Sequence, residues 1–301
     1  MSNTMLQNVV EVCQELGLST PNAVASSSDQ LLVQIMALMN RTGVELMKGY
    51  PWQALQLEHR FYTTVVSDTG DTTSGSAVVT NITDTSSLST NFMVSGTGIP
   101  DDTFILSVDS ATQVTLSAQA SAAGTGTALT FTQVLYTLPS DFDRIESGTE
   151  WDKSSSWQLL GPNDPKEWQY QKSGYISSGP RVRFRLQGDR FSVFPAPSTG
   201  LRYGFEYVSQ NWCTDSSGTG QAKFAADTDL SLIPDELLVL GTKAKFNLAK
   251  GFDATSTIME YKTAVRNAQA NDKGSADINL GRSKAKFLID STNLPDTGYG
   301  A

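Results

Sequence analysis

The apolar positions follow a helical period at the two ends of the chain and a period of two between them. Near the N-terminus, Thr4 and Gln7 have the spacing of a capping box, and apolar residues then recur every three or four positions. This pattern predicts a helix over residues 4–17. A broader apolar stripe predicts a second helix over 29–48.

The C-terminal third of the chain returns to the helical period. Pro234 stands before two acidic residues, where the helix dipole favours negative charge, and Gly251 has the place of a helix terminator. We therefore expect helices over 234–250 and 254–272. With the N-terminal pair, they predict a helical bundle.

The middle of the chain alternates between apolar and polar residues, which is typical of half-buried strands. In the stretch RVRFRL, for example, Val182, Phe184 and Leu186 share one face. The stretch LRYGFEYV alternates in the same way. Residues 134–212 are therefore predicted to form a β meander.

One block of the chain has a different composition. Residues 63–133 contain no Lys, Arg or His, and they are rich in Thr, Gly and β-branched residues. About five short strands at a spacing of roughly ten residues predict a small β-sandwich. Because inserted domains are tolerated at loop tips, we expect this block to be an insertion between two strands of the host.

The fold class predicted from these patterns is α+β. It combines a helical bundle formed by the N- and C-terminal helices, a β-rich central part and an inserted small β-sandwich. The body comprises 1–62 and 134–274, and the insert is 63–133. The last residues, 275–301, have no clear periodicity and are expected to form an extended tail.

Charge and composition exclude several kinds of site. The chain of 301 residues has a net charge of −9, which disfavours tight, sequence-independent binding of nucleic acid. No signal peptide and no membrane-spanning segment are expected. Cys13 and Cys213 are interpreted as free thiols of a protein made in a cytoplasm. One His and two distant Cys cannot complete a Cys–His zinc site, and no cofactor or metal is expected.

Residues with catalytic chemistry are few. The single histidine, His59, has no G-x-S-x-G motif to accompany it, so a structural role is favoured over a triad. Acidic residues lie near Trp151 and Trp157, as in glycosidase sites, although an exposed loop explains them more simply. Arg181, Arg183 and Arg185 fit phosphate contacts or, more simply, the solvated face of a strand. The protein is expected not to be an enzyme.

Three stretches resemble a known family. They are YTLPSDFDRI, with Tyr136, Leu138, Pro139, Asp141 and Phe142; EYVSQNWCTDSSGTGQAKFAADTDLSLIPDELLVLGTKAKFNLAKG; and the ending INLGRSKAKFLIDSTNLPDTGYG. With the N-terminal helical pair, they resemble head-to-tail adaptor (connector) proteins of tailed bacteriophages, in particular podovirus adaptors related to tail tubular protein A. The resemblance covers 1–62 and 134–301. The block 63–133 looks like the immunoglobulin-like domains inserted into phage virion proteins.

The resemblance implies a structural role in the virion. Such adaptors form a homo-oligomeric ring, typically a dodecamer, at the head–tail junction (the neck). The ring docks under the portal protein, extends the DNA channel and provides a platform for the tail nozzle protein. Genomic DNA passes through the lumen without sequence-specific binding. Tail fibres are possible further partners of the body or the insert, and no membrane is involved.

The resemblance also implies where the portal is bound. We expect the helices within 234–272 and the tail to face the portal. An extended tail that orders on binding adds contact area only when the partner is present. The tail residues predicted to bind the portal are Arg282, Lys284, Lys286, Phe287, Leu294 and Tyr299.

Two alternatives stay open at this point. The Thr-rich insert also fits a tail-fibre or decoration protein that binds a cell-surface glycan through its β domain. The acidic residues and tryptophans near Trp151 also fit a cell-wall hydrolase. The helical ends of the chain favour the adaptor over both.

Overall fold

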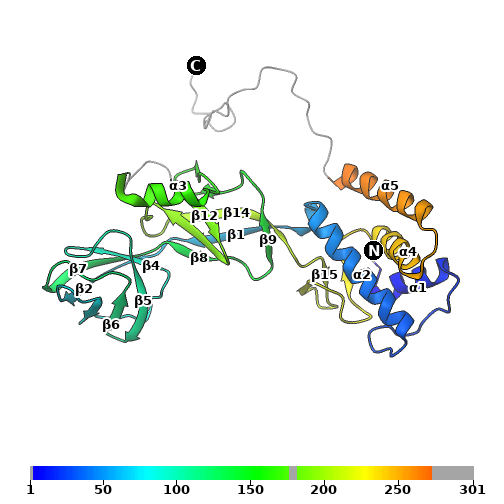
Figure 1. The fold of residues 1–301 in the computed structure, drawn as a ribbon, viewed down its shortest axis with the longest axis horizontal. Coiled ribbons are helices and arrows are strands. Elements are labelled where there is room, and N and C mark those ends of the chain that lie inside the picture. The colour runs from blue at the N-terminus through cyan, green and yellow to red at the C-terminus, as the bar shows by residue number, and fades with distance from the viewer. Residues whose placement is uncertain (1–2, 176–181, 273–301) are drawn as a thin grey trace, which may run out of the picture. The chain divides into compact units, whose positions relative to one another are not determined.

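The computed structural model describes residues 3–175 and 182–272 and confirms the α+β class. The chain divides into two compact units (Figure 1). The helical unit comprises Met1–Leu57, Asp141–Arg144 and Tyr207–Ala301, and the β unit comprises Glu58–Ser140 and Ile145–Glu206. The predicted division into body, insert and tail stays a prediction. The predicted portal-binding residues lie outside the described residues; they are Arg282, Lys284, Lys286, Phe287, Leu294 and Tyr299.

Within the described residues, the helical unit has four helices: α1 (Met5–Glu15), α2 (Gln30–Gly49), α4 (Asp235–Lys250) and α5 (Thr255–Asp272). Thr4 caps α1, and both hydrogen bonds of the capping box with Gln7 are present. Helix α1 ends before the predicted residue 17, because Gly17 adopts a left-handed conformation with φ of 68°.

The core of the helical unit joins segments from both ends of the chain. Apolar residues of α1, α2 and α4 pack in one buried cluster, and α5 adds partly buried residues such as Tyr261 and Val265. The cluster also includes Val208, Trp212 and Phe224, which lie outside these helices. A simple helical bundle is therefore not confirmed, because strand and loop residues complete the core.

Trp212 is one of the largest fully buried side chains of this core. Its side chain is fully buried, its indole N–H donates to the carbonyl of Ala222 at 2.8 Å, and its ring meets Phe224 edge to face. A Cβ atom at Gly43 of α2 would clash with the Trp212 ring. Gly43 is therefore required by the close approach of this ring to the helix.

Short strands and a small turn accompany the helices. A three-stranded sheet has the order β16-β15-β17, formed by β15 (Cys213–Thr214), β16 (Gly220–Gln221) and β17 (Leu230–Ser231). The 3₁₀ turn η1 (Gln53–Leu55) precedes the strand β1 (Gln56–Tyr62). None of the helices in the described ranges has the length and apolarity needed to cross a bilayer.

The block without positive charge folds as a closed six-stranded barrel in the β unit. Its strands, in the order β2-β3-β6-β5-β4-β7 around the barrel, are β2 (Val65–Thr72), β3 (Val78–Thr80), β6 (Gln113–Leu116), β5 (Thr103–Ser110), β4 (Phe92–Gly96) and β7 (Gly124–Gln133). The predicted immunoglobulin-like sandwich is not confirmed. Strand β7 pairs with β2 on one side and with β4 on the other, so the sheet closes on itself.

The barrel has its own core and a narrow connection to the rest of the chain. Its buried cluster includes Val114, Leu129 and Phe131 and no residue from outside the barrel block. Val65, the first residue of β2, pairs with Thr132 near the end of β7. The chain therefore enters and leaves the barrel at neighbouring positions, as expected for an inserted domain.

The remaining strands do not form the predicted meander over 134–212. One sheet has the order β12-β13-β8, from β12 (Arg183–Gln187), β13 (Arg190–Phe194) and β8 (Leu135–Thr137). The other has the order β1-β14-β10-β11, from β14 (Arg202–Ser209), β10 (Trp151–Asp152) and β11 (Trp157–Gln158), and β9 (Phe142–Ile145) also pairs with β14. The helix α3 (Pro165–Tyr170) and the π-helical turn η2 (Gln171–Tyr175) interrupt the strands.

Candidate functional site: a pocket beside the barrel and an exposed helical face

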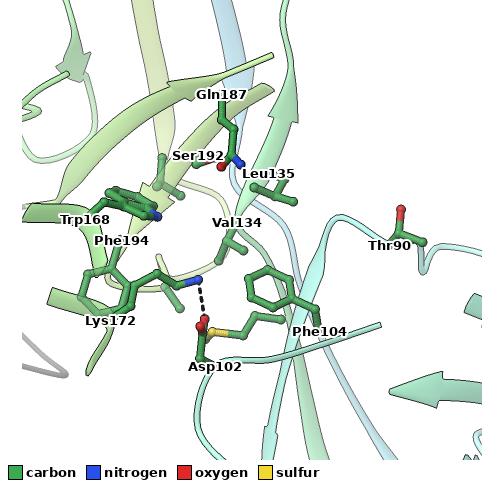
Figure 2. A pocket seen from close by; sticks show the side chains of 13 residues that line it. Thr90, Asp102, Phe104, Val134, Leu135, Trp168, Lys172, Gln187, Ser192 and Phe194 are labelled. Atoms are coloured by element: carbon green, nitrogen blue, oxygen red, sulfur yellow. Dashed lines mark ion pairs between the residues drawn. The ribbon is translucent and has the colours of Figure 1, made fainter. Parts of the chain in front are cut away.

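A pocket of about 290 Å³ lies in the β unit between the barrel, the β12-β13-β8 sheet and the α3–η2 segment (Figure 2). The barrel supplies residues of β4, β5 and the turn between them. The sheet supplies residues of all three of its strands. We call this cavity the barrel pocket; it is lined by Thr90, Met93, Asp102, Phe104, Val134, Leu135, Trp168, Lys172, Gln187, Ser192, Val193, Phe194 and Ala196.

Helix α3 brings an aromatic and a cationic side chain to this pocket. Asp164 caps the helix by accepting from the Glu167 N–H at 2.7 Å, and Pro165 has the favoured place in the first turn. Trp168 is buried and meets the Phe194 ring with 6.2 Å between centroids. The continuation of the helix into η2 then places Lys172 at the pocket.

An ion pair joins η2 to the barrel at the pocket. The ammonium of Lys172 lies 2.6 Å from the Asp102 carboxylate and 4.9 Å from the centroid of the Phe104 ring (Figure 2). The Lys172 side chain is only 16% exposed, whereas that of Asp102 is 39% exposed. A cation over an aromatic face adds to the attraction of the opposite charge. The pocket therefore carries both signs of charge and no net charge from this pair.

The sheet contributes a buried hydroxyl with an unmet hydrogen-bonding requirement. Ser192 on β13 is 2% exposed, and its Oγ has no hydrogen-bond partner within the described residues. Buried polar atoms are almost always paired, and each exception needs an explanation. Ser192 and Gln187 both line the pocket, and Figure 2 shows them on the side of the view away from Asp102.

A second polar connection holds the barrel to the sheet. The Arg190 guanidinium of β13 donates to the side-chain carbonyl of Asn91, just before β4. The backbone carbonyl of Asn91 accepts from the N–H groups of Val134 at 3.1 Å and Leu135 at 3.3 Å. Asn91 therefore connects the barrel to the β12-β13-β8 sheet, and Lys172 connects η2 to the barrel.

Three large apolar side chains of the helical unit are exposed: Leu248 of α4, Phe252 in the connection that follows it, and Met259 of α5. We refer to them together as the α4–α5 face. Their exposed fractions are 57%, 63% and 65%. A nearby hollow between α2, α4 and α5 includes Lys245, which lies 2.9 Å from the Glu45 carboxylate and 5.6 Å from the Tyr261 ring centroid.

The histidine singled out in the sequence belongs to an aromatic cluster. The His59 ring lies 5.6 Å from the centroid of Phe61 and 5.4 Å from that of Phe205. Phe61 in turn meets Tyr136 and Phe191. These contacts describe a structural role for His59 in the packing of the β unit.

The acidic residues near Trp151 have separate structural contacts. Asp141 accepts from the hydroxyls of Tyr207 at 3.0 Å and Ser209 at 2.7 Å. Asp152 accepts from two backbone N–H groups of the following turn. Burial raises the pKa of Glu150, which is 1% exposed. Asp141 belongs to the helical unit, and Glu150 and Asp152 belong to the β unit.

The remaining candidates add no further site. Arg181 lies outside the described residues, and Arg183 and Arg185 lie on β12. Both cysteines are buried and free, and burial, followed by the charge of Asp229, raises the pKa of Cys213 to about 12. Across residues 3–175 and 182–272, no three His, Cys, Asp or Glu side chains gather as metal ligands would.

The barrel pocket was missed in the sequence because its residues come from several separate segments. One local signal was present. Asp164 followed by Pro165 has the pattern of a helix start, which places the apolar Trp168 one turn into a short helix. That signal locates one wall and not the cavity.

Comparison with known proteins gives one family. The family model described as SU10 adaptor protein matches residues 103–284, more than half of the chain. The match begins at the first residue of β5 and extends beyond the end of α5. No curated protein sequence matches the chain.

Proposed function

Because the chain belongs to the SU10 adaptor protein family and is a phage adaptor protein, we propose that it is the structural head-to-tail adaptor of a tailed bacteriophage. In this proposal it forms a ring, a dodecamer, that docks under the portal at the neck, extends the DNA channel and carries the tail nozzle. It resembles tail tubular protein A in this role and acts without catalysis. The family match is the observation that carries the proposal.

The α4–α5 face supports a docking role for the helices that the sequence assigns to the portal. Leu248, Phe252 and Met259 are more than half exposed, and α5 has no fully buried residue of its own. Burying such side chains in a partner removes apolar surface from water, which favours association. We assign the portal protein as the partner of this face, together with the tail residues from Arg282 to Tyr299.

The charge of the chain supports a DNA conduit. A net charge of −9 disfavours adhesion of phosphates, so a genome passing through the ring would slide without sequence-specific binding. A ring also requires two different faces on each subunit, since each face meets a different surface of a neighbour.

A tail-fibre or decoration role is less well supported. The family match includes α4 and α5 of the helical unit as well as half of the barrel. A protein that served only to present the barrel would not need the helices to follow an adaptor pattern. Contacts of the barrel with tail fibres remain compatible with the adaptor role.

The proposal is tested by co-sedimentation of the purified chain with portal rings of the same phage, followed by electron microscopy. Phe252→Asp with Met259→Asp places charge on the α4–α5 face and is expected to weaken portal binding more than tenfold. Leu106→Asp changes a side chain of similar exposure, 63%, on the barrel and is the matched control. Deletion of 275–301 should abolish binding. Full binding by both altered proteins would contradict the assignment.

A further inference from the structure

We propose that the barrel pocket binds a neutral, hydroxyl-bearing ring of about the size of one sugar unit. This inference is independent of ring assembly and portal docking. It assigns a ligand class to the cavity between the barrel, the β12-β13-β8 sheet and α3–η2. Four features of the pocket carry it: its size, its unpaired hydroxyl, its internally neutralised charge and its aromatic walls.

The dimensions and lining of the pocket are those of a small-ligand site. Its volume of about 290 Å³ is near the lower end of the range for such sites, roughly 300–1,000 Å³. Most lining side chains are apolar or aromatic, and a few hydrogen-bonding groups face them: Thr90, Asp102, Lys172, Gln187 and Ser192. Such a lining orients a ligand through polar contacts while its apolar surface is removed from water.

Ser192 indicates that the occupant has hydrogen-bonding groups. A buried hydroxyl left without a partner costs free energy, and the cost is removed when a ligand supplies a donor or an acceptor. A purely hydrocarbon ligand would leave Ser192 unpaired. A ligand hydroxyl can donate or accept, so it satisfies the Ser192 Oγ in either orientation.

The ion pair at the pocket favours a neutral ligand. Lys172 and Asp102 already neutralise one another at 2.6 Å, so a charged ligand would have to compete with the existing partner. Both groups retain unused capacity, because an ammonium has three donors and a carboxylate accepts several hydrogen bonds. Neutral hydroxyls can use this capacity without breaking the pair.

The aromatic walls favour a ring over an extended chain. Phe104 and Phe194 are half-buried and line the pocket (Figure 2). The buried Trp168 meets the Phe194 ring at 70°, and the Lys172 ammonium lies over the Phe104 ring. Flat apolar walls complement the C–H faces of a saturated ring, whose hydroxyls then point to the polar groups around it. A peptide segment would need a longer groove, so a single sugar unit fits this cavity better than a stretch of protein.

The test is saturation-transfer NMR on the full chain with glucose, galactose and N-acetylglucosamine, and with indole as an apolar probe of similar size. We expect signal transfer to at least one sugar. Ser192→Ala should weaken its binding by roughly five- to tenfold, the effect of one lost hydrogen bond. Ser95→Ala, on the exposed side of β4, is the matched control and should bind as the unaltered chain does.

The outcomes separate the proposal from its competitors. The sugar proposal would be overturned if no sugar received saturation transfer from the protein. Transfer to indole alone would also overturn it and would indicate an apolar pocket. Sugar binding unaffected by Ser192→Ala would place the ligand elsewhere and also overturn it. Should Ser192→Ala lower the melting temperature, Gln187→Ala provides a second, more exposed variant with the same expected loss. Portal binding is not part of the assay, so failure here leaves the adaptor proposal intact.

Discussion

The barrel and the helical unit show two ways of building a core from one chain. All residues of the barrel cluster come from one continuous block, between Val79 and Phe131. The core of the helical unit needs both ends of the chain. Its connections include the N–H of Met5 donating to the carbonyl of Asp229 at 2.8 Å and the N–H of Val24 donating to Asp227 at 3.0 Å. The barrel is therefore expected to fold as a local unit, and the helical unit only when its ends meet.

The two regions also satisfy their carboxylates differently. The barrel block has no positive charge of its own, and Asp71 accepts from the Gly126 N–H at 2.7 Å and the Asn81 amide at 2.6 Å. The helical unit also has ion pairs between its own residues, such as Lys243 with Glu15 at 2.7 Å. Salt screens the attraction between two exposed charges more than it weakens hydrogen bonds from uncharged donors to a carboxylate, so the two regions are expected to respond differently to ionic strength.

The largest expected effect comes from Trp212→Ala. Removing this fully buried ring leaves a cavity between Gly43 and Phe224 and should lower the free energy of unfolding of the helical unit by about 3–5 kcal/mol. Hydrogen exchange followed by mass spectrometry would report on each unit separately. Amides of α2 and α4 should lose protection while those of the barrel keep it. Equal loss in the barrel would show that the two cores are not independent.

A smaller effect is expected in the barrel from Asp71→Ala. Hydrogen bonds from the Gly126 N–H and then Asn81 hold the pKa of Asp71 below its ordinary value of 3.8. A depressed pKa stabilises the fold above that ordinary value, and the stabilisation is lost as the pH falls through the lower, folded-state pKa. Barrel protection in the variant should therefore be reduced at pH 7 and should approach that of the unaltered chain in acid.

The control for this variant is Asp101→Ala, which removes another exposed carboxylate of the barrel. It should change barrel protection less than Asp71→Ala does at pH 7. A loss in Asp71→Ala that persists unchanged in acid would contradict the charge-dependent explanation and indicate lost packing.

The smallest effect on the helical unit is expected from removing the barrel. Val65 and Thr132 are paired neighbours, so a short Asn-Gly connection can replace the residues between them without moving either end. Urea unfolding of the helical unit, followed by the hydrogen-exchange protection of the α2 and α4 amides, should keep its midpoint. A large fall in that midpoint would show that the barrel supports the helical core.

Local patterns predicted the helices well and the β topology poorly. The capping box at Thr4 and Gln7 depends only on neighbouring residues, and the structure has both of its hydrogen bonds. Closure of the barrel depends on β7 pairing with β2 and β4, which lie far apart in sequence. A pattern of short alternating strands is the same in a sandwich and in a barrel, because each strand has one buried face in both.

The sites were harder to predict than the fold. The barrel pocket brings together Lys172 and Asp102, which are seventy positions apart in the sequence. No local sequence pattern predicts their contact. The exposure of Phe252 and Met259 also depends on tertiary packing. The sequence pattern alone does not show whether another helix covers these side chains. The predicted portal-binding residues of the tail stay a prediction.

The placement of the barrel's two ends has a mechanical consequence. A pull along the chain would reach the barrel at Val65 and Thr132, which lie at the same end of an antiparallel pair. The load would then fall on one inter-strand hydrogen bond after another, as in a zipper, because these bonds run across the strands. The barrel would yield from this end at low force, so tension transmitted through the β unit would extend the chain before it disrupted the helices.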